Sequence, residues 1–156
     1  MEEYEYSFKV KSIVPYIEYC KLNNYKLKKE VKQNRVVYEN INNDKIIARI
    51  TTEDKDNKKT KVINFKNLQE KNNKLKFSYE TIPLQITNKN SKAIESILDV
   101  LEFKKASDLY RIRRVYEKDG VIFEIDEYKI PKMNVVAIEG LRDRVNKIYK
   151  EICNYE

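Results

Sequence analysis

The stretch EYEYSFKV, residues 3–10, alternates strictly between polar and apolar side chains. Successive side chains of a β-strand point to opposite faces of the sheet. Glu3, Glu5, Ser7 and Lys9 therefore share one face, and three aromatic residues and a valine share the other. This strand combines an apolar face suited to a core with a face that carries charge, and the pattern recurs further along the chain.

Several later segments also have the character of strands. Alternation predicts strands over residues 28–39, 45–51, 61–66 and 74–82, and VVAIE at 135–139 forms a further short strand. A strand with Arg111 and Arg113 and a strand with Glu124 and Asp126 flank Asp119-Gly120, which is typical of a β-hairpin. The polar segments 53–60 and 69–73 are expected to be loops.

Three segments have helical periodicity instead, and we expect helices over 12–23, 91–102 and 140–154. About eight strands with only three amphipathic helices leave most of the sheet uncovered. The sequence therefore predicts an α+β protein, a single domain over residues 1–156, in which an antiparallel eight-stranded β-barrel has its helices packed outside. The alternative is an open sheet with one face in water.

Composition narrows the chemistry. The chain has 32 Lys and Arg against 25 Asp and Glu, a net charge of +7, which favours an anionic partner. It has no histidine, which excludes Ser-His and Cys-His catalysis and histidine metal sites. Cys20 and Cys153 form neither a disulfide framework nor a zinc site and are expected to be small apolar residues on helices. With no signal peptide and no apolar run of the ~20 residues that a bilayer requires, we expect a cytoplasmic protein without membrane contact, monomeric or homodimeric.

Charges of both signs recur on the polar faces of the predicted strands. In a barrel these faces would line a tunnel. Carboxylates without His or Cys select hard cations such as Mg²⁺ or Mn²⁺, and Arg and Lys hold phosphate oxygens. A polyanion bridged by a metal ion would satisfy both sets of charges. The residues concerned are Glu3, Glu5, Arg49, Lys66, Lys76, Glu80, Arg111, Arg113, Glu124, Asp126 and Glu139.

Several of these residues lie in motifs whose order along the chain resembles that of the CYTH superfamily. This superfamily includes class IV adenylate cyclases, thiamine triphosphatases and inorganic triphosphatases. Glu3-x-Glu5 resembles the ExExK strand of that family, Arg49 its RxR strand and Lys66 its LTxK lysine. The later matches are Arg111-x-Arg113, Ile125-Asp126-Glu127 and Ala137-x-Glu139, so that the resemblance covers nearly the whole chain.

Three positions depart from the family pattern. Ser7 replaces the lysine of ExExK, Thr51 replaces the second arginine of RxR, and Ala137 replaces the first glutamate of the final ExE motif. Lys9, two residues further along the same face, partly compensates for Ser7. These departures weaken the expectation of catalysis more than that of binding.

The resemblance implies a role for each matched residue. It implies a site for Mg²⁺ or Mn²⁺, a site for the triphosphate, and a catalytic set in which an aromatic residue, here Tyr38 or its neighbour Val37, works with the lysine. The metal ligands would be Glu3, Glu5, Glu80, Glu124, Asp126 and Glu139; the triphosphate-binding residues Arg49, Lys66, Lys76, Arg111, Arg113 and Lys9; and the catalytic residues Glu5, Lys66 and Tyr38.

Four functions follow from this set. The first is metal-dependent hydrolysis of inorganic triphosphate, thiamine triphosphate or a nucleoside triphosphate. The second is a class IV adenylate cyclase, and the third is a module that binds a nucleotide or polyphosphate without turnover. Nucleic-acid binding is the weakest of the four, because acidic residues share the strand faces with the basic ones and would repel a phosphate backbone.

A short sequence match suggests internal duplication. Residues 35–39 read RVVYE and residues 113–117 read RRVYE, and each follows a predicted helix and a basic strand start. Tyr4-Glu5 has a counterpart in Tyr79-Glu80. The chain is therefore expected to consist of two strand-helix-strand units folded together.

Overall fold

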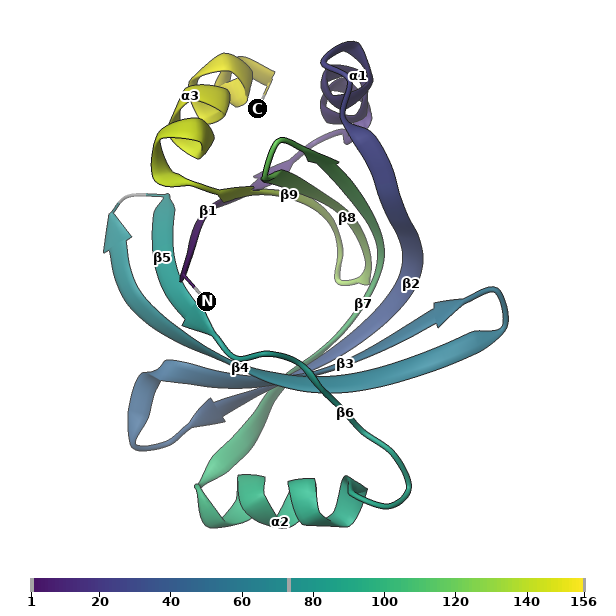
Figure 1. Ribbon diagram of the computed structural model, residues 1–156, viewed down its shortest axis with the longest axis vertical. Coiled ribbons are helices and arrows are strands. Elements are labelled where there is room, and N and C mark those ends of the chain that lie inside the picture. The colour runs from purple at the N-terminus through teal and green to yellow at the C-terminus, as the bar shows by residue number, and fades with distance from the viewer. Residues whose placement is uncertain (1, 73, 156) are drawn as a thin grey trace.

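Antiparallel strands surround a central space in the computed structural model, which describes residues 2–72 and 74–155 (Figure 1). The first half of the chain forms β1 (Glu2–Val10), α1 (Val14–Leu22), β2 (Lys26–Asn40), β3 (Asn43–Lys55) and β4 (Lys58–Asn72). The second half forms β5 (Leu75–Glu80), β6 (Leu84–Gln85), α2 (Ser91–Val100), β7 (Phe103–Lys118), β8 (Val121–Ile130), β9 (Lys132–Gly140) and α3 (Arg142–Ile152), followed by a 3-10 turn (Cys153–Tyr155).

The sheet closes on itself. Its strand order is β3-β2-β7-β8-β9-β1-β5-β4, and β4 pairs in turn with β3, so eight antiparallel strands form a complete barrel. The short β6 pairs with Val62 and Ile63 of β4. The predicted α+β barrel is thus confirmed, and its closure leaves no long unpaired edge among these eight strands.

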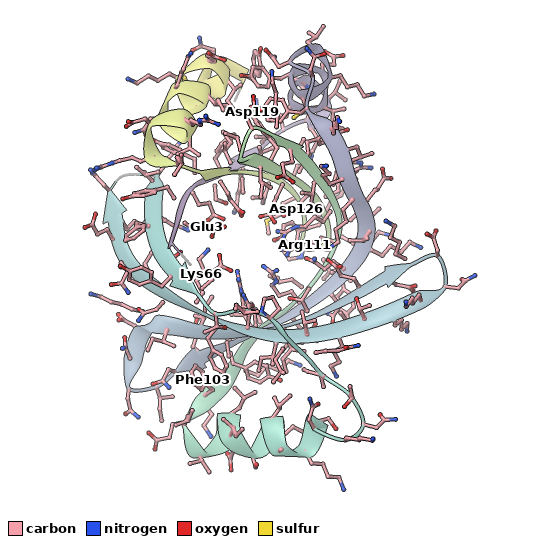
Figure 2. The ribbon with its side chains drawn as sticks, viewed as in Figure 1. Glu3, Lys66, Phe103, Arg111, Asp119 and Asp126 are labelled. Atoms are coloured by element: carbon pink, nitrogen blue, oxygen red, sulfur yellow. The ribbon has the colours of Figure 1, made fainter. Side chains whose placement is uncertain are left out.

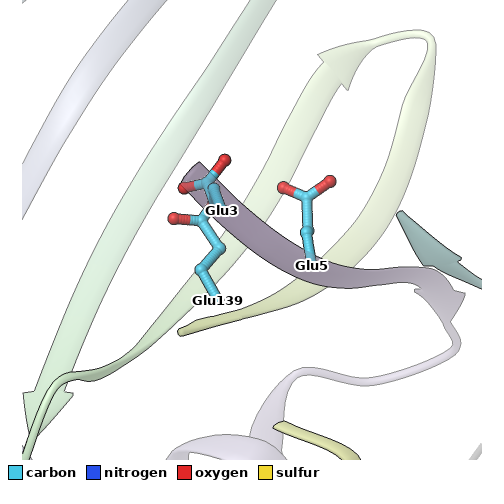
Figure 3. Close-up of side chains that lie close together, drawn as sticks. All are labelled: Glu3, Glu5 and Glu139. Carbon is cyan, nitrogen blue, oxygen red and sulfur yellow. The ribbon is translucent and has the colours of Figure 1, made fainter. Parts of the chain in front are cut away.

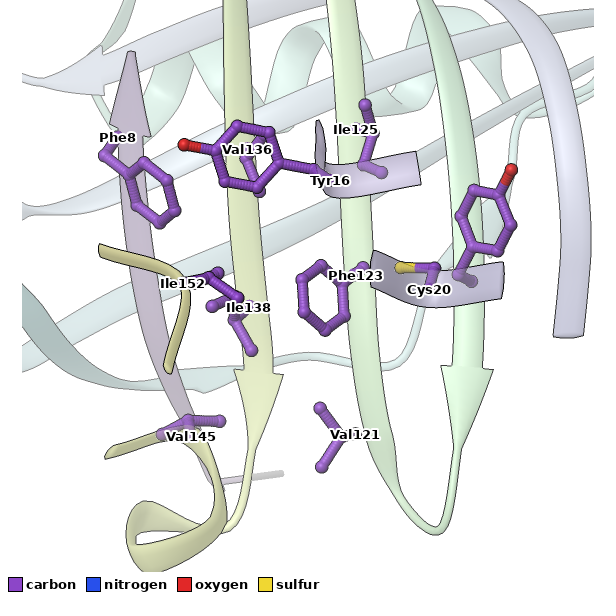
Figure 4. Close-up of a cluster of buried hydrophobic side chains, with 11 residues drawn as sticks. Phe8, Tyr16, Cys20, Val121, Phe123, Ile125, Val136, Ile138, Val145 and Ile152 are labelled. Carbon is purple, nitrogen blue, oxygen red and sulfur yellow. The ribbon is translucent and has the colours of Figure 1, made fainter. Parts of the chain in front are cut away.

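The apolar cores lie outside the barrel, between its wall and the helices. α1 and α3 cover one side, where Phe123, Ile125 and Ile138 are fully buried with Tyr16 of α1 (Figure 4). α2 covers the opposite side (Figure 1), where Ile94 and Leu98 pack on Ala48, Ile63 and Phe103. Burying an aliphatic or aromatic side chain in this way contributes about 1.5–3 kcal/mol. Because the apolar faces all point outward, the polar faces point into the barrel.

The helices agree with the sequence prediction apart from one to two residues at their ends. Cys20 is buried and Cys153 is partly buried, and both are free thiols. Among the described residues, none of the helices combines the length and the apolar character that crossing a bilayer requires.

Two segments predicted as loops are strands. β3 and β4 continue through residues 53–60 to a tight turn at Asp56-Asn57, with Lys55 paired to Lys58. β4 also continues through Asn72, while residue 73 lies outside the described residues. These strand ends are largely exposed on both faces, so their sequence carries no apolar alternation that would reveal a strand.

Apart from the short β6 and the final helix α3, the two halves of the chain repeat one order of elements: a strand, a helix and three strands. The pairings repeat as well, since β2–β3–β4 in the first half corresponds to β7–β8–β9 in the second. In the β2–β7 ladder Arg35 pairs with Leu109 and Arg113 pairs with Val31, so each arginine faces the residue four positions before the other. The register is therefore symmetric about the RVVYE and RRVYE motifs, as expected for a duplicated unit.

Candidate functional site

The barrel encloses a polar cavity of about 520 Å³. Figure 2 shows Glu3, Lys66, Arg111 and Asp126 directed into it, whereas Phe103 lies on the α2 side of the wall. All eight barrel strands contribute side chains, because every second residue of each strand points inward. The charged lining residues are Glu3, Glu5, Lys29, Arg35, Arg49, Glu53, Lys66, Glu80, Arg111, Arg113, Glu124, Asp126 and Glu139.

Ten of the thirteen residues predicted for the site line this cavity. The other three do not. Tyr38 packs against the α2 core, because the inward face of β2 runs through Gln33 and Arg35 and so places Tyr38 on the outer face. Lys9 is exposed near the end of β1, and Lys76, although paired with Glu5 in the β1–β5 ladder, is not part of the cavity lining.

Three carboxylates gather at one point of the wall (Figure 3). Glu5 of β1 pairs with Glu139 of the adjacent β9, and Glu3 lies two residues before Glu5 on the same face. One carboxylate oxygen from each of the three lies within 4.8 Å of the others. We call Glu3, Glu5 and Glu139 the carboxylate cluster.

The electrostatics of the carboxylate cluster suit a divalent cation. Burial and a hydrogen bond with Glu80 raise the pKa of Glu3 to about 7. Burial and the charge of Glu124 raise the pKa of Glu139 well above its usual value. Oε2 of Glu3 is buried without a hydrogen-bond partner among the described residues, 3.7 Å from Lys66 Nζ. Crowded carboxylates that resist ionising together, with an oxygen left over, are the donor set that Mg²⁺ or Mn²⁺ uses, so the residues fit such an ion.

Glu80 and Glu124 flank the carboxylate cluster, and each forms an ion pair with an arginine. Glu80 accepts hydrogen bonds from Arg49 and from Asn64 Nδ2, the latter at 3.1 Å. Burial alone would raise the pKa of Glu80, but hydrogen bonding with Glu3 and the charges of Arg49 and Lys66 outweigh it and hold the pKa at about 2. Likewise, Arg113 Nη1 donates to Glu124 at 2.8 Å, and its charge outweighs burial and lowers the pKa of Glu124.

Asp126 holds Arg113 in a two-pronged ion pair. Arg113 Nε and Nη2 donate to the two oxygens of Asp126, both at 2.9 Å, and both residues are buried. This pair, with Glu124, outweighs the desolvation of the guanidinium and raises the pKa of Arg113. Because both oxygens of Asp126 are occupied, the structure places Asp126 with Arg113 and apart from the carboxylate cluster.

Arg111 has an unused donor in the cavity. Its Nε donates to Gln33 Oε1 at 2.7 Å and its Nη1 donates to the hydroxyl of Tyr128 at 2.6 Å. Nη2 is buried and has no hydrogen-bond partner among the described residues. Burial and the charge of Arg113 lower the pKa of Arg111. A buried, unpaired guanidinium N–H on a cavity wall is costly unless an anion accepts from it.

Sequence reasoning missed several lining residues, chiefly on β2 and β3. Lys29 Nζ lies 2.5 Å from Glu53, and Gln33 donates to the same carboxylate at 2.8 Å. Arg35 also lines the cavity, beside Thr51. Residues 29–35 read KEVKQNR and do not alternate between polar and apolar side chains, so no signal in the sequence marks the inward face of β2, which only the β2–β7 register reveals.

Among known proteins, the chain is similar to solved structures that share its fold. No family model and no curated protein matches the chain. Solved structures do match: the PH1012 protein from Pyrococcus horikoshii OT3 is 20% identical, with 98% of this chain and 88% of that one covered and a TM-score of 0.74. HpAC1 from Hippeastrum, an adenylyl cyclase candidate described as having a dominant triphosphatase activity, is 16% identical over 97% of this chain and 86% of that one, with a TM-score of 0.66. A chain of the Schizosaccharomyces pombe Mediator head module is 7% identical, with coverages of 99% and 96% and a TM-score of 0.69.

These similarities define a fold. The chain shares with these structures the fold that its resemblance to the CYTH superfamily predicted, and its own eight-stranded antiparallel barrel has a charged interior. At such low identities the similarity establishes the fold alone. What this particular protein does must be argued from its own cavity.

Proposed function

We propose that the protein hydrolyses a triphosphate compound in a metal-dependent reaction inside the barrel. The substrate would be inorganic triphosphate, thiamine triphosphate or a nucleoside triphosphate. The observation that carries the proposal is that one cavity combines the carboxylate cluster with a buried, unpaired donor on Arg111. A cavity with both a cation site and an anion site suits a metal-bound polyphosphate better than it suits a metal ion alone or an anion alone.

The arginines would hold the phosphate oxygens. Arg111 offers Nη2, and the tether to Gln33 and Tyr128 fixes the plane of its guanidinium. Asp126 likewise fixes the plane of Arg113. A guanidinium that is oriented before binding loses less side-chain entropy when it grips a phosphate.

The carboxylate cluster would hold Mg²⁺ or Mn²⁺. Such an ion would supply Lewis-acid chemistry, polarising a phosphoryl oxygen and lowering the pKa of water. Lys66 Nζ lies 3.7 Å from Glu3 and 3.9 Å from Glu5, so it is placed to stabilise negative charge that develops on the phosphate beside them. Glu5 would accept a proton from the attacking water, since the chain offers no histidine for that role.

The departures at Ser7 and Ala137 also favour a module that binds without turnover. These two residues are direct partners in the β1–β9 ladder. The lysine and the glutamate that the resemblance expects there would face each other, so their joint absence removes a matched pair of charges and leaves no charge unpaired. The balance of charge in the cavity is therefore kept, which supports binding of a triphosphate. Whether the bound triphosphate is hydrolysed is what the experiment below decides.

The deciding experiment measures phosphate release from inorganic triphosphate, thiamine triphosphate and ATP with Mg²⁺ or Mn²⁺, and assays cyclic AMP in the ATP reactions. We expect phosphate release that chelation abolishes, and a loss of about 100-fold or more in kcat for Glu5→Gln, which keeps the side-chain volume but removes a ligand charge. Glu18→Gln, on the exposed face of α1, is the matched control and should keep full activity.

Cyclic AMP as the main product would favour the cyclase. Tight triphosphate binding with no turnover under either metal would replace the hydrolase by a binding module. Absence of both binding and turnover would refute the proposed function altogether.

A further inference from the structure

Arg35 of β2 lies beside position 51 of β3, a position where the resemblance predicts an arginine. Position 51, where an RxR strand has its second arginine, holds Thr51. Arg35 of β2 is its direct partner in the β2–β3 ladder and donates from Nε to Thr51 Oγ1 at 3.1 Å. The cavity therefore has a guanidinium at this place on its wall, supplied by the neighbouring strand.

Arg35 differs from the other cations of the cavity in its partners. Arg49 pairs with Glu80, Arg113 with Asp126 and Glu124, and Lys29 with Glu53. Lys66 has Glu3 and Glu5 at 3.7 and 3.9 Å, and Arg111 has Asp126 at 3.9 Å. Among the described residues, no carboxylate lies within ion-pair distance of Arg35.

The positive charge of Arg35 is destabilised in the protein without ligand. Burial, followed by the charges of Arg113, Arg49 and Arg111, lowers the pKa of Arg35 to about 9. Thr51 satisfies one of the five guanidinium N–H donors, and no described protein group accepts from the Nη atoms. The charge of Glu124 acts in the opposite direction but does not outweigh burial and the three arginines, and Glu124 makes no ion pair with Arg35. An anion that enters the cavity beside Arg35 would therefore stabilise its charge.

We propose that Arg35 binds a phosphate group of the substrate and does the work that an arginine at position 51 would otherwise do. This inference rests on the proposed function. It assigns the chain a phosphate-binding residue outside the motifs that resemble the family. It also explains how the cavity retains its phosphate grip although Thr51 carries no charge.

The test measures the affinity for inorganic tripolyphosphate by calorimetry, in Mg²⁺ and separately in chelator. Arg35→Gln should weaken binding about tenfold to 100-fold, the range expected for a lost charge-assisted hydrogen bond. Lys32→Gln is the matched control, since Lys32 is exposed on the opposite face of the same strand, and it should change the affinity less than twofold. Arg35→Met serves as a second variant in case Arg35→Gln does not fold.

Moving the charge back provides the stricter test. Arg35→Thr should lose affinity as Arg35→Gln does, and the double variant Arg35→Thr/Thr51→Arg should recover to within about threefold of the wild type. A purely structural role for Arg35 predicts no such rescue. If the wild type does not bind tripolyphosphate, the proposed function fails. If the wild type binds and Arg35→Gln and Arg35→Met bind equally well, the proposed function stands and the inference about Arg35 is overturned.

Discussion

The two halves of the barrel share one order of elements but bring different charges into the cavity. The first half, β1 to β4, contributes the cations Lys29, Arg35, Arg49 and Lys66 with three carboxylates. The second half, β5 to β9, contributes only Arg111 and Arg113 with four carboxylates. A symmetric backbone therefore surrounds an asymmetric site, in which a cation-rich half meets a carboxylate-rich half.

The difference is sharpest at one pair of equivalent positions. Arg35 and Arg113 begin the two repeated motifs, and their partners on the next strand are Thr51 and Asp126. Asp126 forms an ion pair with Arg113 and fixes its orientation, whereas Thr51 accepts a hydrogen bond from Arg35 but provides no countercharge. The comparison teaches that one repeat stabilises the wall through a closed ion pair, while the other keeps a cation available to a ligand.

The largest effect should come from breaking the closed pair. Asp126→Asn removes one of the two carboxylates that pair with a buried guanidinium. Because Glu124 remains, the free energy of unfolding should fall by about 3 kcal/mol, the lower end of the usual loss of about 3–5 kcal/mol when one partner of a buried pair is removed. Urea unfolding of the metal-free protein measures this change.

Arg35→Gln provides the contrast in the first half. It removes a cation that has no carboxylate partner, so the free energy of unfolding should stay unchanged or rise. Equal destabilisation by Asp126→Asn and Arg35→Gln would show that the two repeats do not differ in this way.

A second, smaller effect should appear in the pH dependence of stability, where Glu3 of the first half and Glu80 of the second act in opposite directions. The pKa of Glu3 is raised to about 7 in the folded state, so the folded protein binds the extra proton and stability falls as the pH rises from about 4.5 to 7. The pKa of Glu80 is lowered to about 2, so its contribution is present above about 4.5 and is lost as the pH falls toward 2.

These two groups therefore place a stability maximum near pH 4.5 in metal-free protein. The fall toward pH 7 should be on the order of 2–3 kcal/mol, since one pKa unit corresponds to about 1.4 kcal/mol. Urea unfolding across this range checks it. Glu3→Gln should flatten the fall, and an undiminished fall in that variant would assign it to other groups.

The sequence predicted the fold through alternation and helical periodicity, but it could not assign every strand position to a face. The parity of β1 is plain because Tyr4, Tyr6 and Phe8 separate the glutamates. On β2 the apolar run of RVVYE hides the parity, so nothing in the pattern could decide between Tyr38 and Val37, the two residues that the resemblance allowed, and Arg35 was overlooked. The partners of Arg113 were also invisible, because they depend on cross-strand register, which only the closed barrel fixes.

The smallest effect concerns two hairpin turns, one in each half. The turn between β3 and β4 has Asp56 at φ 51° and Asn57 at φ 63°, and the turn between β7 and β8 has Asp119 at φ 49° and Gly120 at φ 78°. Positive φ at both central residues is typical of a type I′ turn, in which glycine at the second position is free of the strain that a side chain brings. The two turns thus differ mainly in the residue at that second position.

Exchanging these residues tests whether the turns are equivalent. Gly120→Asn should lower stability by a few tenths to about 1 kcal/mol, because a Cβ at position 120 would contact nothing within 4 Å and only its backbone conformation is penalised. Asn57→Gly should gain a similar amount, but at the end of a long exposed hairpin the gain should appear in slower amide exchange near Lys55 and Lys58 before it appears in global unfolding. If Asn57→Gly instead speeds exchange there, the asparagine side chain stabilises its turn through contacts that the glycine turn lacks, and the two hairpins are not equivalent.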